Sequence, residues 1–92
     1  MIAKPTIANV SVTLADTEYS YSLPDGTRRF SVKLRDVGAE LKIAFEASDS
    51  STTYVMLPSG RSYNELNVKG GGNTLYFQSP TAGQVAEVLS WK

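Results

Sequence analysis

The chain has 92 residues, of which 41% are hydrophobic, and nine basic and nine acidic side chains leave it with no net charge. It contains neither Cys nor His, which excludes disulfides, thiolate or histidine metal sites and histidine acid–base catalysis. A chain of this length forms one small domain that buries about 60–65% of its unfolded surface, so association between copies is an expected source of further stability. The balanced charge by itself favours neither a nucleic-acid nor a membrane partner.

The N-terminal residues predict a short arm. Residues 1–6 form this arm, where Pro5 disfavours the start of a helix, and residues 7–92 form a single domain. Residues 1–5 lack the apolar run of a signal peptide, and no stretch approaches the ~20 apolar residues of a membrane span. We therefore expect a soluble protein that is made in a cytoplasm and has no membrane partner.

Apolar and polar residues alternate along most of the chain, which is typical of half-buried strands. The alternation predicts strands over residues 10–14, 19–23, 30–35 and 41–45. Residues 39–47 are also good helix formers, but the strict period of two favours a strand. The apolar residues of the third and fourth strands are expected to face the core: Phe30, Val32, Leu34, Leu41, Ile43 and Phe45.

Two similar turn signals separate these strands. Pro24, Asp25 and Gly26 predict a tight turn at which two antiparallel strands meet, because proline presets the first position and glycine accepts a positive φ. Residues 57–61 repeat this pattern, but the flanking residues do not match, so we interpret a reused turn rather than an internal repeat.

Further short strands are predicted over residues 54–57, 63–68 and 74–79, followed by a closing strand over residues 85–91. Turn signals recur every ~9–13 residues, and no helix is expected. The sequence therefore predicts an all-β fold, an antiparallel β-sandwich or jelly-roll-like small domain of about eight strands.

The closing strand is apolar on both of its faces, which indicates that it is covered on both sides. Val85, Leu89 and Trp91 share one face, whereas Ala86 and Val88 share the other. We expect the first face to fill the core and the second to be covered by another layer or by a neighbouring copy. Ala86 and Val88 are therefore candidates for an interface between copies. Trp91 is a further candidate, because its large ring near the end of the sequence needs to be covered by the domain or by another chain.

The third strand carries a concentration of positive charge. Its basic residues, with one from the next strand, are candidates for contact with a phosphate or an acidic protein surface: Arg28, Arg29, Lys33, Arg35 and Lys42. The alternative is a solvated strand face whose charges discourage aggregation. Asp36, Glu40 and Glu46 lie nearby in the sequence and dilute the positive field, so nucleic acid is not an expected partner.

Several other patterns resemble binding sites but lack the context that such sites need. Tyr54, Tyr63 and Tyr76 would stack on sugar rings, although tyrosines in strands also pack with their hydroxyls at the rim. The glycines at residues 70–72 are not followed by Lys and Ser or Thr, so they predict a hairpin tip rather than a phosphate loop. Asp49 is the only carboxylate in its loop, which is too few for calcium. We predict no catalytic residue, cofactor or metal ligand.

The order of the motifs is similar to that of a known class of proteins. Leu-Pro-Asp-Gly-Thr-Arg-Arg-Phe, Leu-Lys-Ile-Ala-Phe, Leu-Pro-Ser-Gly, Thr-Leu-Tyr-Phe-Gln-Ser and a C-terminal Val-Leu-Ser-Trp follow one another between residues 19 and 91. This order resembles small structural proteins of tailed-bacteriophage virions, single-domain β-sandwich or jelly-roll proteins of the head decoration, cement or head-fibre type. The resemblance implies a symmetric oligomer, often a trimer, seated on the capsid, and it implies no catalytic residues.

Two functional hypotheses follow from the resemblance and the residues together. The first is a non-enzymatic decoration or cement subunit on the virion surface, which stabilises the head by contacts with the major capsid protein. The basic residues of the third strand would supply the capsid contacts. The alternative is a fibre-tip or adhesin module that binds host-surface carbohydrate through the three tyrosines.

Overall fold

The computed structural model describes residues 4–36, 38–66, 68 and 73–92, and these form a small all-β domain. The predicted glycine loop at residues 70–72 lies outside the described residues. Within them, eight strands and one short 3-10 turn follow in chain order: β1 (Thr6–Val12), β2 (Tyr19–Ser22), β3 (Arg29–Leu34), β4 (Leu41–Ala44), η1 (Asp49–Ser51), β5 (Val55–Leu57), β6 (Ser62–Glu65), β7 (Thr74–Gln78) and β8 (Gln84–Trp91).

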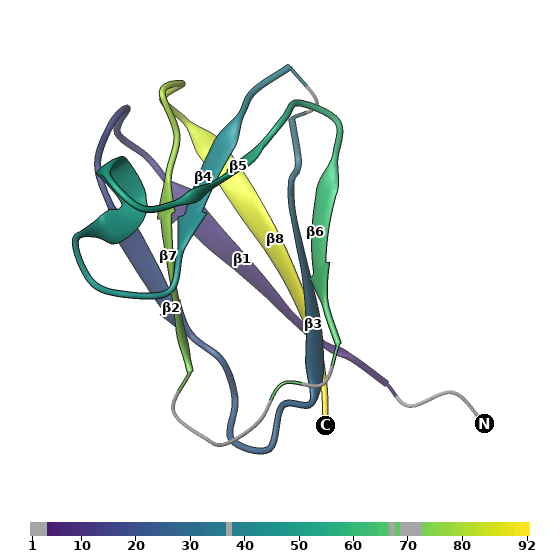
Figure 1. Ribbon diagram of the computed structural model, residues 1–92. Helices are drawn as coiled ribbons and strands as arrows, with labels where there is room; N and C mark the ends of the chain where they lie inside the picture. The colour runs from purple at the N-terminus through teal and green to yellow at the C-terminus, as the bar shows by residue number, and fades with distance from the viewer. Residues whose placement is uncertain (1–3, 37, 67, 69–72) are drawn as a thin grey trace.

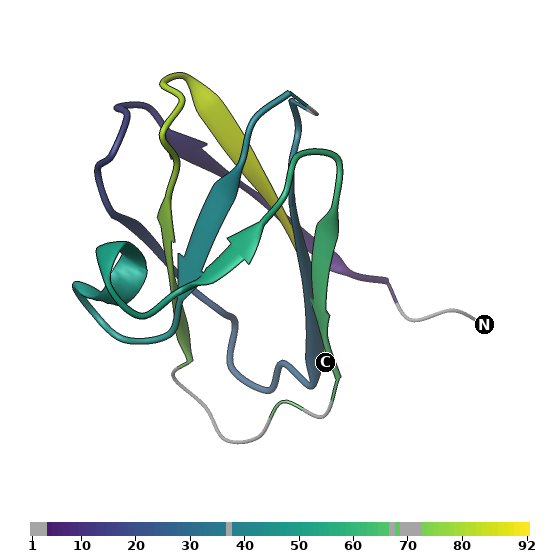
Figure 2. The same cartoon turned by 45° about the horizontal axis from the view of Figure 1, so that its top comes forward.

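The strands form two four-stranded sheets that face each other (Figures 1 and 2). Sheet A has the order β1-β8-β3-β6 and sheet B has the order β2-β7-β4-β5, and the paired strands are antiparallel. Apart from β4 and β5, strands that follow one another in the chain lie in different sheets. This is the arrangement of an eight-stranded jelly roll, so the predicted fold class is confirmed.

Both predicted proline–glycine turns form, but they do not join paired strands. The amide of Thr27 donates to the carbonyl of Pro24 at 3.2 Å, and Gly26 has a φ of 83°. The prediction that antiparallel partners meet here is wrong, because β2 pairs with β7, whereas β3 pairs with β6 and β8. A turn whose third residue has positive φ splays its flanking strands instead of continuing their twist.

The second turn makes the same step in the topology. The amide of Arg61 donates to the carbonyl of Pro58 at 3.2 Å, and Gly60 has a φ of 77°. It carries the chain from β5 in sheet B to β6 in sheet A, as the first turn carries it from β2 to β3. The shared motif is therefore a device for changing sheets, used twice.

The core lies between the inner faces of the two sheets. Five of the six residues predicted to face it on β3 and β4 are buried, and Phe45 is not, because its side chain is 48% exposed. β4 ends at Ala44, and Phe45 lies at the open end of the sandwich, where it is only partly covered. The buried apolar cluster consists of Val12, Leu23, Phe30, Val32, Leu34, Ala39, Leu41, Ile43, Leu57, Leu75, Phe77, Ala86 and Val88.

The closing strand β8 presents to the core the opposite face from the one predicted. Ala86 and Val88 are 0% exposed, whereas Val85, Leu89 and Trp91 are half-buried on the outside of sheet A. Residues that lie directly opposite each other in a sheet share a face, and Val88 pairs with the buried Val32 of β3. Ala86 and Val88 are consequently core residues, and their assignment to an interface between copies is wrong.

The loop between β4 and β5 folds against sheet B. Its turn η1 packs on β4 and β7, where Ala44 is buried. The Glu18 carboxylate anchors the loop by accepting hydrogen bonds from the amides of Ser48 and Ser50, at 2.9 and 3.2 Å, and from the Ser50 hydroxyl. The Ser50 hydroxyl and then the Ser48 amide hold the pKa of Glu18 below its ordinary value. The Asp49 loop is thus organised by a carboxylate from outside it.

Candidate interaction surface

The outer face of sheet A is the surface on which apolar and charged side chains meet. Its members come from the three adjacent strands β1, β8 and β3, whose registers place them side by side, and from Arg35, which directly follows β3 and donates its amide to the carbonyl of Val85. We call the following set the outer A face: Ile7, Arg29, Ser31, Lys33, Arg35, Val85, Glu87, Leu89 and Trp91.

An apolar row crosses the middle of the outer A face. Ile7 of β1 lies opposite Leu89 of β8, which lies opposite Ser31 of β3. Ile7 is 67% exposed, and Leu89 is half-buried. Because Ser31 is short, a hollow of about 220 Å³ remains, bordered also by Lys33 and Glu87. The row gives a partner an apolar depression rather than a smooth sheet.

One carboxylate is shared by two cations next to this hollow. Glu87 accepts a charged hydrogen bond from Arg35 Nε at 2.9 Å and pairs with Lys33 Nζ at 3.2 Å. These contacts, that of Arg35 first, hold the pKa of Glu87 below its ordinary value. The two cations are each more than half exposed, so they remain accessible to a partner. Since both share Glu87, this part of the face retains an excess of positive charge.

The end of the outer A face is closed by an aromatic ring. The guanidinium carbon of Arg29 lies 4.6 Å from the centre of the Trp91 ring, within the range of a cation–π contact. The carbonyl of Trp91 accepts a hydrogen bond from the amide of Arg28 at 2.7 Å. Trp91, a candidate for an interface between copies, is therefore held on the molecular surface by both its backbone and its ring.

The structure separates the five predicted basic residues into different places. Arg29, Lys33 and Arg35 share the outer A face, and Arg28 lies on the connection just before β3. Lys42 is on β4 in sheet B, and its ammonium group lies 4.9 Å from the centre of the Tyr54 ring. Lys42 therefore belongs to the opposite side of the domain from the other basic residues.

The three candidate sugar-binding tyrosines are also dispersed. Tyr63 points inward from β6, with its ring centre 6.0 Å from that of Phe30. Tyr76 lies on the outer face of β7, and Tyr54 precedes the edge strand β5. Tyr63 is thus separated by a sheet from Tyr76, and the three rings do not form one outward groove.

Comparison with known proteins gives a likeness in fold and none in sequence family. No protein family matches the sequence, and no curated protein is similar to it. The structure is similar to the solution structure of a de novo designed double-stranded β-helix, with a TM-score of 0.54 and 17% sequence identity. The match covers 97% of this chain and 99% of the designed one. At this identity the likeness concerns the arrangement of the strands alone.

Two features are absent from the residues that the structure describes. Within these residues, no three His, Cys, Asp or Glu side chains lie together in a way that could hold a metal ion. No helix in the same part of the chain has the length and apolarity required to cross a membrane.

The sequence reasoning missed Ile7, Leu89 and Glu87 as members of the candidate surface. From the sequence, Leu89 is expected in the core, and Ile7 is expected only at the start of the domain. A usable signal was present in β3, where Lys33 lies between the buried residues Val32 and Leu34 and marks the outer side. The pairing of β3 with β8 is needed to show that Leu89 and Glu87 lie on this same outer side.

Proposed function

We propose that this protein is a non-enzymatic structural protein of a bacteriophage virion, a decoration or cement subunit that binds the capsid. The observation that supports this proposal is the outer A face, where the exposed Ile7 and the half-buried Leu89 and Trp91 adjoin exposed cationic groups. An interface typically has an apolar centre and a polar rim, and this face has both. The jelly-roll fold also occurs widely among viral capsid domains.

The charge of the face defines the partner surface that fits it. Arg29, Lys33 and Arg35 outweigh Glu87, so the complementary capsid surface is acidic with an apolar projection that enters the hollow beside Leu89. Complementary charge brings the partners together and sets their orientation, while the apolar contact supplies most of the burial.

The size of the face indicates that several copies act together. Eight residues along β8 and the three strands β1, β8 and β3 across the sheet span roughly 26 by 14 Å, or about 370 Å². A stable interface commonly uses about 800 Å² from each partner. One face is therefore a weak attachment, and a symmetric oligomer, which the resemblance implies to be a trimer, strengthens it through multivalency.

The edge of sheet B offers apolar side chains for contacts between copies. Tyr54, Val55 and Met56 are 38–42% exposed; Val55 and Met56 lie on the short edge strand β5, and Tyr54 comes directly before it. They lie in the other sheet from the outer A face, so a subunit would contact its neighbour and the capsid at the same time. Light scattering of wild type and of Met56→Lys tests this part of the proposal, and the variant is expected to be monomeric.

The attachment itself is tested with capsids that lack the protein. Lys33→Glu and Arg35→Glu variants should cosediment with such capsids less than wild type, and wild-type binding should weaken as salt is raised, because exposed charges are screened. Arg61→Glu is the matched control, since it makes the same change of charge in the exposed turn between β5 and β6, outside the outer A face. If all three variants bound these capsids as well as wild type does, the outer A face would not be the capsid-binding surface.

The adhesin alternative receives less support from the geometry. It requires a shallow aromatic groove on the outside, whereas Tyr63 packs against Phe30 and Phe45 between the sheets. Tyr54 carries the ammonium group of Lys42 over its ring, and Tyr76 lies on a different strand. We therefore retain the capsid-binding function as the proposal.

A further inference from the structure

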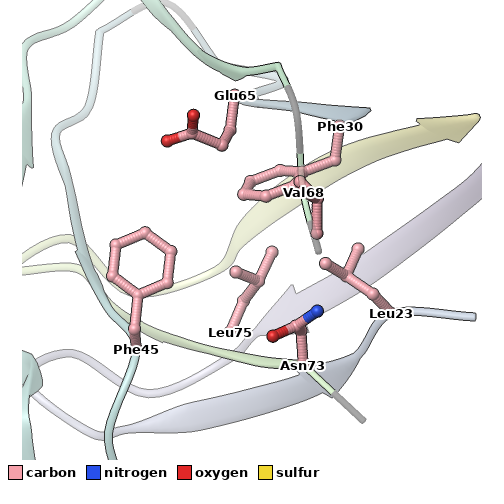
Figure 3. A pocket seen from close by; sticks show the side chains of 7 residues that line it. All are labelled: Leu23, Phe30, Phe45, Glu65, Val68, Asn73 and Leu75. Carbon is pink, nitrogen blue, oxygen red and sulfur yellow. The ribbon is translucent and has the colours of Figure 1, made fainter. Parts of the chain in front are cut away.

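A second feature lies at the open end of the sandwich, between the two sheets. Here a cavity of about 230 Å³ extends inward from the surface (Figure 3). Its inner wall is made by Leu23, Phe30 and Leu75, which are only 1–4% exposed. Phe45 and Val68 complete the apolar lining nearer the surface. The cavity is thus deep enough to remove an apolar group from water.

A carboxylate is held within this apolar lining. Glu65 lies on the inner side of β6, directly opposite the buried Phe30 of β3. The Tyr63 hydroxyl donates a hydrogen bond to Glu65 Oε2 at 3.0 Å. Burial of the phenol is the main cause that raises the pKa of Tyr63, and this hydrogen bond is the second. The phenol therefore stays a neutral donor that orients the carboxylate. Of the described residues that line the cavity, Glu65 is the ionisable one, and Asn73 adds an amide at the rim.

Two aromatic rings, those of Phe30 and Phe45, line the same cavity as Glu65. The Phe30 and Tyr63 ring centres are 6.0 Å apart and tilted by 33°, and those of Phe45 and Tyr63 are 6.2 Å apart and tilted by 51°. In Figure 3 the Glu65 carboxylate lies on the same side of the cavity as the Phe45 ring. Faces of aromatic rings attract cations, and the negative charge of Glu65 adds to that attraction.

We propose that this cavity binds a small organic cation, an alkylated or methylated ammonium group of the choline type. A neutral apolar ligand would desolvate Glu65 without compensation, and an anion would be repelled by it. A metal ion would require several more oxygen ligands than one carboxylate. An ammonium group with apolar substituents satisfies the carboxylate and the apolar wall together. The volume is sufficient, because a cavity of about 150 Å³ already holds benzene.

This proposal is independent of capsid attachment and is tested by titrating the purified protein with choline while its amide NMR signals are recorded. We expect saturable shifts at Glu65 and Leu75. The neutral isostere 3,3-dimethylbutan-1-ol, in which carbon replaces the charged nitrogen, should bind about tenfold more weakly. Equal affinity for choline and this alcohol, or no saturable shift with choline, would overturn the proposal.

Two substitutions locate the binding site. Glu65→Gln keeps an acceptor for the Tyr63 hydroxyl but removes the charge, so choline should bind about tenfold more weakly to it. The matched control is Glu40→Gln, which removes a carboxylate at the other end of β4 from Phe45 and should leave the affinity unchanged. An equal loss in both variants would mean a general charge effect and would contradict the proposal.

The ammonium group has two sources with the same chemistry, a free molecule and a lipid headgroup. Cosedimentation with phosphatidylcholine vesicles, compared with phosphatidylglycerol vesicles, separates them. Binding to free choline and to phosphatidylcholine vesicles would support the proposal and assign the headgroup. Binding to free choline alone would support it and assign the free cation.

Discussion

The two faces of β8 should respond differently to the removal of one side chain from each. Val88 is 0% exposed and packs between the sheets, whereas the adjacent Leu89 is half-buried on the outer A face. Val88→Ala removes two methyl groups from the core and leaves a void behind. Leu89→Ala removes a larger side chain, but one that is already in partial contact with water.

The magnitudes follow from burial. Two buried methyl groups account for about 1.6 kcal/mol of transfer free energy, and the void adds to this, so Val88→Ala should lower the free energy of unfolding by about 2–3 kcal/mol. Leu89→Ala should cost roughly 1 kcal/mol or less, because the outer face lacks a covering layer in the single chain. The smaller truncation is thus expected to be the more damaging one.

Urea denaturation measures both variants. The fluorescence of Trp91, the single tryptophan of the chain, and far-ultraviolet circular dichroism report the transition. With a urea dependence of roughly 1.5 kcal/mol per molar, Val88→Ala should lower the midpoint by about 1.3–2 M. The measurement is made in dilute solution, so that any loss of contacts between copies is kept separate.

A double-mutant cycle tests the register directly. Val88 lies opposite Val32, and both are 0% exposed, so Val32→Ala and Val88→Ala should couple by about 0.5 kcal/mol or more. If Leu89→Ala instead cost more than Val88→Ala, or if the two valine substitutions were strictly additive, the assignment of the inner face of β8 would be wrong.

Three further predictions concern a turn, a loop anchor and the C-terminus. Gly60→Ala should lower the free energy of unfolding, measured by thermal denaturation, by about 1–2 kcal/mol, because the φ of 77° is strained for an L residue. A clash is not the cause, since nothing lies within 4 Å of the new methyl group. Gly60→Asn should recover part of the loss. The pKa of Glu18 is lowered in the folded chain, so Glu18 stabilises the fold above its unfolded-state pKa, and this stabilisation disappears as the pH falls through the folded-state pKa. The difference in free energy of unfolding between wild type and Glu18→Gln should therefore shrink on acidification from pH 7. A difference that does not depend on pH would contradict this. Trp91→Ala should lower the free energy of unfolding by about 1–2 kcal/mol, because the Trp91 ring is half-buried beneath Arg29. A fully buried tryptophan would account for ~3–5 kcal/mol. A loss in that higher range would indicate that the Trp91 ring is covered in solution.

The candidate surface illustrates how strand pairing creates sites that are distant in the sequence. Ile7 and Leu89 lie near opposite ends of the chain but are directly opposite each other in sheet A. Glu87 forms ion pairs with Lys33 of the neighbouring strand β3 and with Arg35, which follows that strand. The positive charge of β3 was evident from its residues, but the sequence did not indicate that Glu87 neutralises part of this charge or that apolar residues lie beside it.

Local sequence was sufficient to predict about eight strands, but β1 extends over Thr6–Val12 rather than over residues 10–14 and so begins within the predicted arm. Strict alternation on β3 and β4 identified the buried residues Val32 and Ile43, because a period of two leaves one face polar and the other apolar. Positive φ at Gly26 and Gly60 was likewise implied by the residues of the turns. In each case the residues that carry the information are neighbours in the chain.

Tertiary structure alone decided the orientation of β8 and the exposure of Phe45. β8 is apolar on both faces, so its own pattern does not distinguish inside from outside. Pairing with β3, whose outer side is marked by Lys33, places Val88 in the core and Leu89 on the surface. Phe45 continues the alternation of β4 but lies past the last residue of that strand, at the open end of the sandwich, where little covers its ring. Burial there depends on what the opposite sheet supplies, and that is a property of the assembled fold.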